Sequence, residues 1–316
     1  MDYLSGWCQS KRRLDGSTAI VTGCNTGIGK ETALDFYTRG ARVIMACRNT
    51  SKAETAKKEI EDRTKSKANK GTLTIEQLDL CSLKSIRDFA TKVLENEKQI
   101  NILVNNAGVM MCPEGKTEDG FETHMGSNHF GHALLTILLL PAMVKSGPSR
   151  IVNVSSYVHT HHNLPLDDVN YEKTPYDPYA AYCRSKVANI LFAKGLAQKL
   201  KEHNITGVTT YSLHPGVIRT EISRHFSDTV WYGATWAFNN IMGLFLKSPV
   251  CGAQTQIYCA VDEGCADQTG LYYSDCAVKA PSKQCRDDAV VEQFWKITVD
   301  ILKYDPFSDE NLKKLQ

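Results

Sequence analysis

Long apolar runs are missing from this sequence of 316 residues, and their absence bears on where the protein resides. No stretch reaches the 18 or more consecutive apolar residues of a typical membrane-spanning helix. The first 16 residues lack the apolar core of a signal peptide, so 1–16 is predicted to be an N-terminal extension without a membrane anchor. We expect a cytoplasmic protein that makes, at most, peripheral contact with an intracellular membrane.

An excess of charge of either sign is also missing. Lys and Arg number 37 and Asp and Glu number 35, which leaves a formal net charge of +2, and the basic residues are spread along the chain. Nucleic-acid-binding proteins usually carry a basic patch or stripe, so no nucleic-acid partner is expected. The eleven cysteines contain no CxxC pair, and their odd number favours reduced thiols over a metal site or a disulfide framework.

What the sequence does contain is a regular alternation of short β-branched runs and longer helical patterns. Continuous apolar strands separated by helices indicate a parallel sheet covered on both faces. We therefore predict an α/β protein with one doubly wound, Rossmann-type parallel sheet in a single domain over 17–316. Pro141 lies late in one helical run and should kink or end that helix. The predicted strands cover 18–23, 41–46, 72–78, 100–106, 150–156 and 207–213, and the predicted helices cover 28–39, 52–65, 83–97, 123–145 and 179–201.

A glycine-rich turn, VTGCNTGIGKETA, joins the first predicted strand to the first predicted helix. Gly23, Gly27 and Gly29 follow GxxxGxG spacing, one residue longer than the usual dinucleotide fingerprint. Glycines let the backbone approach a pyrophosphate closely, and the free N–H groups of a helix N-terminus attract its negative charge. Glycines are common in loops of any kind, but in this strand–turn–helix setting they predict a dinucleotide site.

A residue close behind the second predicted strand favours one of the two nicotinamide cofactors. NAD sites of this type have an Asp or Glu about 20 residues after the glycine turn, where it binds the ribose 2′-hydroxyl. In this chain Arg48 stands nineteen residues after Gly29. A guanidinium binds a 2′-phosphate through a fork of hydrogen bonds, whereas a carboxylate repels it. NADP(H) is the expected cofactor; the alternative is an ordinary surface arginine at a strand end.

Tyr182 and Lys186 lie four positions apart in the last predicted helix, so they share one helical face. They could be an ordinary solvated pair. An ammonium close to a phenol, however, stabilises the phenolate and lowers its pKa from the usual value near 10. Such a pair suits hydride transfer, because the cofactor carries the hydride and the protein must move one proton.

Four motifs together resemble the short-chain dehydrogenase/reductase superfamily over nearly the whole chain. They are the glycine turn TGCNTGIG, NNAG at 105–108, YCRSK at 182–186 and HPG at 214–216, in the family's order. Finer details, among them ACRN, NHFGHALLT and SLHPGVIRTE, look like the retinol dehydrogenase branch. Tyr182 lies 26 residues after Ser156, about twice the family's interval, and the insert resembles the longer loop of that branch.

The resemblance implies a set of site residues. Tyr182 would be the general acid or base, Lys186 would hold the ribose hydroxyls, and Asn128 would support a proton relay. The family pattern, and no physical argument, selects Ser156 over Ser155 as the serine that binds the substrate oxygen. The implied catalytic residues are Asn128, Ser156, Tyr182 and Lys186, with no metal. The implied cofactor-binding residues are Gly23, Asn25, Thr26, Gly27, Ile28, Gly29, Arg48, Asp79, Asn105, Ala107, Gly108, Tyr182, Lys186, Pro215, Gly216, Val217 and Thr220.

By the same resemblance, 220–247 would form a substrate lid and 287–316 a C-terminal helical tail. Within the lid, 231–246 is uncharged and mostly apolar, which is too much apolar surface to leave in water. This stretch is expected to line a substrate pocket or to contact a membrane. The alternative is a plain core helix.

These features predict an NADP(H)-dependent oxidoreductase that interconverts an apolar alcohol and its aldehyde or ketone, with retinol and retinal favoured. The first alternative is a carbonyl reductase for steroids or other lipids. The second is a non-catalytic NADP(H)-binding sensor or scaffold, which would need the loss of a catalytic residue, although all four are present. The expected partner is a small apolar substrate, and a homo-oligomer is compatible with the sequence.

Overall fold

The computed structural model describes residues 2, 5–218 and 247–315. Thr220 and the lid predicted over 220–247 therefore lie outside the described residues, except for Lys247. The part of the lid singled out above for its apolar composition, 231–246, also lies outside them.

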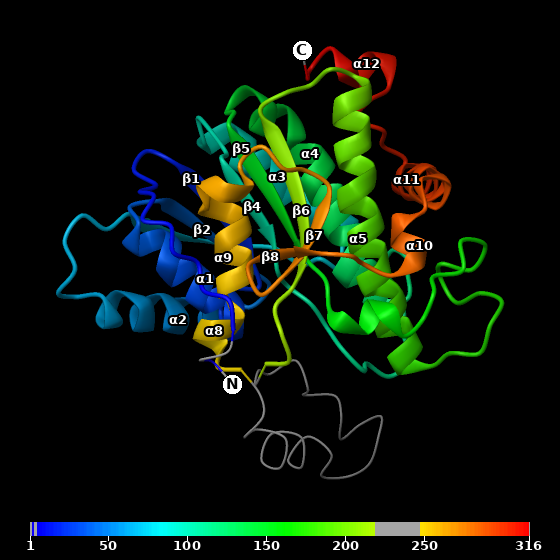
Figure 1. Cartoon of the computed structure of the whole chain (residues 1–316), viewed down its shortest axis with the longest axis horizontal. Coiled ribbons are helices and arrows are strands. Elements are labelled where there is room, and N and C mark those ends of the chain that lie inside the picture. The colour runs from blue at the N-terminus through cyan, green and yellow to red at the C-terminus, as the bar shows by residue number, and fades with distance from the viewer. Residues whose placement is uncertain (1, 3–4, 219–246, 316) are drawn as a thin grey trace, which may run out of the picture.

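Strands from the whole length of the described chain form one sheet (Figure 1). In spatial order these eight strands are β3 (Thr72–Gln77), β2 (Arg42–Cys47), β1 (Thr18–Thr22), β4 (Ile102–Asn105), β5 (Ser149–Val154), β6 (Val208–His214), β7 (Leu271–Ser274) and β8 (Ala277–Lys279). Neighbouring strands are parallel except for β7 and β8, which are antiparallel. The predicted doubly wound parallel sheet is confirmed, and each of the six predicted strands is present.

Helices cover both faces of the sheet (Figure 1). One hydrophobic cluster joins the sheet to α1 (Gly27–Thr38), α2 (Thr50–Arg63) and α9 (Gln254–Val261). A second cluster, on the opposite face, joins it to α3 (Leu83–Asn96), α4 (Gly131–Lys145) and α5 (Pro178–Glu202). The shorter elements are the π-helix η2 (Met125–Phe130), the 3₁₀ helices η3 (Tyr157–Thr160) and η6 (Glu263–Cys265), and the single-turn helices α8 (Pro249–Gly252), α10 (Lys283–Arg286) and α12 (Asp309–Leu312).

Pro141 does not end its helix, contrary to one of the two outcomes predicted for it. The helix α4 runs through this proline and continues to Lys145. A proline inside a helix costs about 3 kcal/mol because it removes one hydrogen bond and crowds the preceding turn. Ten residues of α4 are buried, and each large apolar side chain contributes roughly 1.5–3 kcal/mol on burial, so packing outweighs the proline.

The combined helix Met125–Lys145 is long and apolar enough to cross a membrane by length and composition. Within it, 78% of the most apolar stretch of 18 residues is buried, in the same hydrophobic cluster as α3 and α5. A buried core helix of a globular domain has the same composition, and burial is what the structure shows for this one.

Both ends of the described chain pack against the sheet layers. At the N-terminal end, Leu14 is buried and its N–H donates to Arg39 O just after α1. At the C-terminal end, α11 (Asp288–Leu302) packs along α5, with the rings of Phe192 and Trp295 stacked 5.6 Å apart. The predicted helical tail thus forms a further layer outside α5.

The carboxyl ends of four central strands meet at one edge of the sheet. Gly23 follows β1, Asn106 follows β4, Ser155 follows β5 and Pro215 follows β6. In open parallel sheets, ligands bind in the crevice outside these strand ends, where the strand order reverses. The order here reverses between β1 and β4, so this edge is where a site is expected.

Candidate active site

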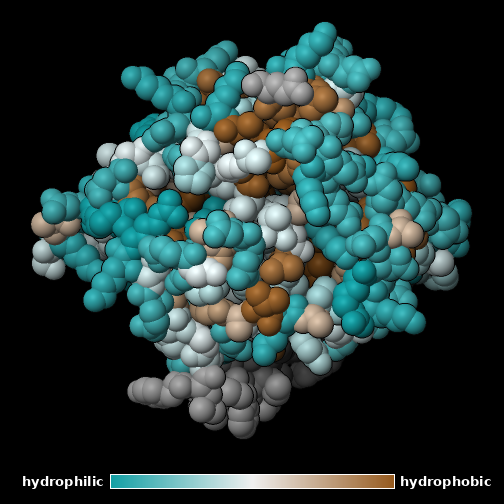
Figure 2. Space-filling model, turned by 45° about the horizontal axis from the view of Figure 1, so that its top comes forward, coloured by the Kyte–Doolittle hydropathy of each residue, from teal (hydrophilic) through white to brown (hydrophobic). Residues whose placement is uncertain are grey.

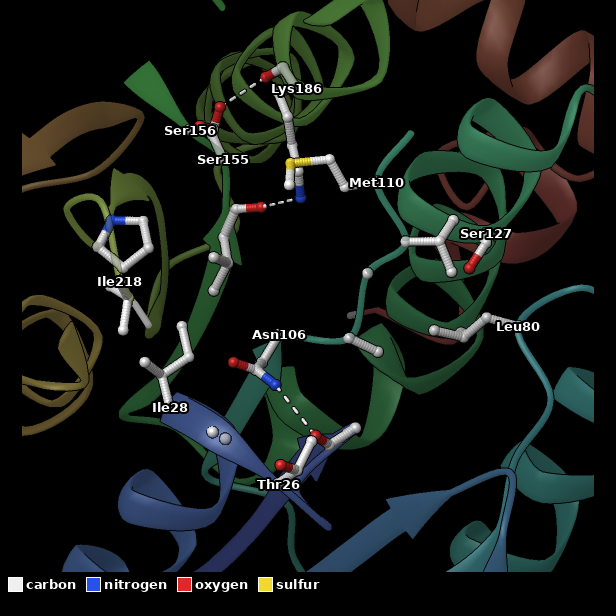
Figure 3. Close-up of a pocket in the computed structure, with 18 of the residues that line it drawn as sticks. Thr26, Ile28, Leu80, Asn106, Met110, Ser127, Ser155, Ser156, Lys186 and Ile218 are labelled. Carbon is white, nitrogen blue, oxygen red and sulfur yellow. Dashed lines mark hydrogen bonds between the residues drawn. The ribbon is translucent and has the colours of Figure 1, made fainter. Parts of the chain in front are cut away.

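A cavity of about 570 Å³ lies at that edge of the sheet (Figure 3). Nearly all of the predicted site residues within the described chain line it. These are Gly23, Asn25, Thr26, Gly27, Ile28, Gly29, Arg48, Asp79, Ala107, Gly108, Ser156, Tyr182, Lys186, Pro215, Gly216 and Val217. Asn105 and Asn128 are not among the lining residues, and Thr220 lies outside the described residues.

The glycine turn forms one wall of the cavity, and its three glycine positions do not accommodate side chains. Gly23 and Gly27 have φ values of +63° and +57°, in the left-handed region that favours glycine. A Cβ on Gly29 would lie 2.4 Å from Asn106 Nδ2 and 2.9 Å from Gly23 O. The backbone at this turn is therefore packed closely against the loop after β4 and is open only toward the cavity.

The N-terminus of α1 belongs to the same wall, so its first backbone N–H groups border the cavity. Thr26 is the N-cap residue and makes no side-chain cap hydrogen bond, and the first turn contains no acidic residue. An uncapped helix N-terminus with flanking glycines suits a phosphate or pyrophosphate. These residues fit the dinucleotide that the sequence predicts.

Cations lie at the far end of the cavity, after β2. Arg48 is exposed there, and Lys52 lines the cavity one helical turn further on. Asn49 between them caps α2 by accepting a hydrogen bond from Lys52 N at 2.9 Å. Lys52 is not among the residues predicted from the sequence, because its approach to the cavity depends on how α2 packs beside β2.

Asn105 is predicted to bind the cofactor, but its side chain does not line the cavity. Its side chain is buried within the sheet, where Nδ2 donates to Thr136 Oγ1 and Asn153 Oδ1, both at 2.9 Å. The next residue, Asn106, lines the cavity instead, and its Nδ2 donates to Thr22 O at 2.8 Å. Successive side chains of a strand alternate between faces, so the side chain of Asn106, and not that of Asn105, faces the cavity.

Asn128 lies behind the cavity wall, on the π-helix η2. Its Oδ1 accepts from Val109 N at 2.8 Å, and its Nδ2 donates to Val109 O and Ser185 Oγ, both at 3.0 Å. The side chain thus ties the loop after β4 to α5. Its carbonyl oxygen accepts a hydrogen bond from His132 Nδ1 at 3.0 Å, one turn further on. A π-bulge within a helix often marks a functional position.

Tyr182 and Lys186 are both buried on the face of α5 that borders the cavity, with 5% and 2% of their surfaces exposed. The Lys186 Nζ lies 5.6 Å from the centre of the Tyr182 ring and donates to Val154 O at 3.1 Å. Burial lowers the pKa of Lys186 to about 8. The two residues are not a solvated surface pair, which was the alternative interpretation.

The protein's own groups raise, rather than lower, the pKa of Tyr182. Burial is the dominant cause, and a hydrogen bond with the Ser156 side chain opposes it. The sequence predicts that Lys186 lowers this pKa. In the structure the Lys186 ammonium donates to the Val154 carbonyl. The effect of burial on the pKa of Tyr182 therefore outweighs the effect of Lys186.

The two serines after β5 have different surroundings (Figure 3). Ser155 is buried, and its hydroxyl donates to Lys186 O at 2.6 Å, which anchors β5 to α5. Ser156 lines the cavity and its side chain is hydrogen-bonded to Tyr182. Ser156 is therefore the serine beside the tyrosine hydroxyl, as the family pattern implied.

A doubly wound sheet, a glycine-lined phosphate wall and a buried Ser–Tyr–Lys group in one cavity define a dinucleotide-dependent oxidoreductase. The sequence profile of the family described as short chain dehydrogenase matches residues 17–231, and the chain belongs to this family. Members of the family use NAD or NADP.

Relatives over nearly the whole chain are retinol dehydrogenases. The chain is 47% identical to "Retinol dehydrogenase 11" of Homo sapiens, over 94% of this chain and 89% of that protein. It is 46% identical to "Retinol dehydrogenase 13" of Homo sapiens, over 93% of this chain and 87% of that protein. A crystal structure of a putative uncharacterized protein from Mycobacterium paratuberculosis has the same fold, with a TM-score of 0.73 and 28% identity over 95% of this chain and 99% of that one.

Proposed function

We propose that this protein is an NADP(H)-dependent oxidoreductase that interconverts an apolar alcohol and its aldehyde or ketone, with retinol and retinal as the favoured pair. The observation that carries the proposal is the hydrogen-bonded pair of Ser156 and Tyr182 in the same cavity as the glycine turn. A hydroxyl pair near the end of a dinucleotide cavity can hold a substrate oxygen and exchange a proton with it.

Tyr182 is the proposed general acid in reduction and general base in oxidation. In reduction its hydroxyl gives a proton to the oxygen on which negative charge develops, and Ser156 donates a hydrogen bond to the same oxygen. A bound nicotinamide would supply or accept the hydride, and its oxidised form would add positive charge to the cavity that Tyr182 borders. That charge opposes the effect of burial on the pKa of Tyr182. Lys186 donates a hydrogen bond to Val154 O and lines the cavity beside Tyr182 and Ser156.

The proposed preference for NADP(H) depends on Arg48 and Lys52. Both line the end of the cavity after β2, where the adenosine ribose of a dinucleotide bound along the glycine turn would lie. Hydrogen bonds to charged groups contribute about 1.5–3 kcal/mol each. Two cations at this end suit a 2′-phosphate better than a hydroxyl.

An apolar substrate is supported by the wall beside Ser156 and by the relatives. Val109, Met110, Val158 and Tyr179 line the cavity near the Ser156–Tyr182 pair. The names of the relatives specify retinol for those proteins. A steroid or other lipid carbonyl would satisfy the same apolar wall, which makes such a reductase the second candidate. We further propose a cytoplasmic protein whose apolar residues 231–246 contact membrane surfaces peripherally.

Turnover measured at 340 nm tests the proposal. The purified protein is mixed with NADPH or NADH and, in turn, with retinal, a steroid ketone and a medium-chain aldehyde. We expect NADPH oxidation with retinal at the highest kcat/KM. A steroid ketone as best substrate would favour the second candidate. Tight NADPH binding without turnover of any carbonyl would instead indicate the non-catalytic sensor or scaffold.

A further inference from the structure

The peptide group between Ser156 and Tyr157 is held on both sides by histidine side chains. It is among the first peptide groups beyond the end of β5, and it determines where the Ser156 hydroxyl lies. The Ser156 carbonyl is hydrogen-bonded to His159 Nδ1 at 2.7 Å. The N–H of Tyr157 donates to His214 Nδ1 at 3.0 Å. No part of the chemistry described above uses either imidazole.

These contacts fix opposite tautomers on the two histidines. A carbonyl only accepts, so His159 carries its proton on Nδ1, and its Nε2 accepts from Ser282 N at 3.1 Å. His214 accepts on Nδ1, so its proton is on Nε2. Both imidazoles are therefore neutral, one acting as a donor and the other as an acceptor.

The two histidines come from separate parts of the fold. His159 belongs to η3, is 2% exposed, and packs against the ring of Tyr272 in β7 with centroids 4.9 Å apart. His214 is the last residue of β6, the strand that pairs with β5. Through Ser282, the first histidine also connects the serine to the segment before α10, beyond the 17–231 stretch that matches the family.

We propose that His159 and His214 are positioning residues that hold the Ser156 hydroxyl at Tyr182; this inference rests on the proposed function. Local contacts alone hold the serine weakly. Its Oγ accepts from Val158 N only at 3.5 Å, and its carbonyl also accepts from the backbone N–H of His159 at 3.2 Å. The two imidazoles add a contact on each side of the peptide group and restrict its rotation.

Burial keeps both rings neutral near pH 7. Burial lowers the pKa of His214 to about 4, with Lys247 acting in the same direction and Asp275 opposing it. Burial also lowers the pKa of His159, aided by His161, while the bond to the Ser156 carbonyl opposes it. Protonation of His214 Nδ1 would convert the acceptor into a donor and break its bond with Tyr157 N–H.

Matched variants separate positioning from general stability. His214→Leu removes the acceptor, whereas His214→Asn puts an amide oxygen close to the former Nδ1. We expect His214→Leu to lower kcat for retinal by about 10- to 100-fold, the range that follows a misplacement near 1 Å, with KM and NADPH Kd within about twofold. His214→Asn should recover most of kcat. Equal losses in both variants, or no loss in the leucine variant, would overturn the proposal.

A double-mutant cycle tests whether the effect passes through Ser156. In a Ser156→Ala background, His214→Leu should cause no further loss of kcat, because the group that it positions is gone. Multiplied losses would contradict the proposal. If His214→Leu melts far below the wild type, His214→Gln replaces it, since its amide oxygen lies beyond the reach of Tyr157 N–H and the side chain stays polar. The same design applies to His159. His159→Leu removes the donor to the Ser156 carbonyl, whereas the Nδ2 of His159→Asn can still donate to it.

Nitrogen-15 NMR of the imidazoles tests the geometry without turnover. The expected result is a neutral Nδ1–H tautomer for His159 and a neutral Nε2–H tautomer for His214 at pH 7. A protonated Nδ1 on His214 would overturn the proposal even if the enzyme is active. A wild-type protein that turns over no carbonyl would instead refute the proposed function, and the tautomers would still report whether the two contacts exist.

Discussion

At the scale of single residues, the proposed preference for NADP(H) rests on the side chain of Arg48. This residue lies directly after β2 at the end of the cavity, with Lys52 one turn further on. The sequence was sufficient to predict that Arg48 lies near the glycine turn in the folded protein, because its spacing from that turn is a local property. Lys52 could not be recognised in the same way, since its approach to the cavity depends on how α2 packs beside β2.

Arg48→Asp should reverse the cofactor preference. The loss of charged hydrogen bonds worth about 1.5–3 kcal/mol should raise the NADPH Kd by roughly 10- to 150-fold. NADH, which has no 2′-phosphate, should bind as well as before or better. Lys58→Asp is the matched control, because Lys58 is exposed on the same helix and does not line the cavity. An unchanged ratio of the two Kd values in Arg48→Asp would refute the assignment of Arg48.

Buried Lys186 should give the protein a measurable pH dependence of stability. Burial lowers its pKa to about 8, and unfolding returns that pKa to about 10.4. Between these values the unfolded chain binds the additional proton, so the free energy of unfolding rises with pH. The contribution is complete above pH 10.4 and is lost as the pH falls to 8.

Comparison with Lys186→Met isolates this contribution. The difference in unfolding free energy between wild type and variant should shift by about 2 kcal/mol in favour of the wild type from pH 8 to pH 10.4. Val154 O keeps a donor in the variant, because Asn189 Nδ2 also lies 3.1 Å from it. Urea denaturation at both pH values measures the shift. A constant difference would mean that Lys186 keeps an ordinary pKa in the folded protein.

At the scale of helices and strands, the repeating apolar pattern predicted most elements within two residues of their observed ends. The strands β7 and β8 were missed because four and three residues are too few to produce a recognisable alternation. The helix α9 was not predicted either, because its eight residues span only about two turns and give a weak periodic pattern. Pro141 shows the limit of a local rule, since burial of α4 outweighs the preference of one residue.

The junction of β1 and α1 gives a prediction at this scale. A Cβ at Gly29 would meet Asn106 Nδ2 and the Gly23 carbonyl, so Gly29→Ala must displace the glycine turn or the loop after β4. Overpacking costs about 1–3 kcal/mol. If this cost weakens the binding of NADPH, we expect its Kd to rise roughly 5- to 150-fold.

Gly120→Ala is the control for that experiment. Gly120 has a φ of +85° and no heavy atom within 4 Å of an added Cβ, so alanine there strains the backbone without touching the site. It should lower Tm and leave the NADPH Kd unchanged. Calorimetric titration of both variants with NADPH measures the affinities, and an unchanged Kd in Gly29→Ala would show that the turn does not hold the cofactor.

At the scale of the whole molecule, the site is assembled from segments far apart in sequence. The motifs that line the cavity could be found from the sequence because each has a local spacing. Their supports could not be found: His159 contacts Ser282, and Asn105 joins Thr136 and Asn153. Such partners are fixed by the packing order of the strands, which no local pattern encodes.

Residues 231–246 should govern substrate choice and membrane contact together. Four large apolar side chains contribute about 6–12 kcal/mol gross on burial, at 1.5–3 each, part of which is lost in ordering the segment. Replacing Trp236 and Phe245 with Ser should therefore raise KM for retinal far more than for a short, soluble aldehyde and reduce binding to liposomes. NADPH affinity should be unchanged. Equal losses for both aldehydes, together with a much lower Tm, would identify the stretch as structural core.

The central claim is that Tyr182 transfers the proton in an NADP(H)-dependent reaction at this cavity, and Tyr182→Phe tests it most directly. The control is Tyr179→Phe, because Tyr179 also lines the cavity and its hydroxyl bonds His161 at 2.5 Å. We expect Tyr182→Phe to bind NADPH normally while its kcat for retinal falls at least about 100-fold, the lower end of general acid–base contributions. Tyr179→Phe should stay within a few-fold of the wild type. A Tyr182→Phe enzyme that keeps kcat within about tenfold of the wild type would contradict the account.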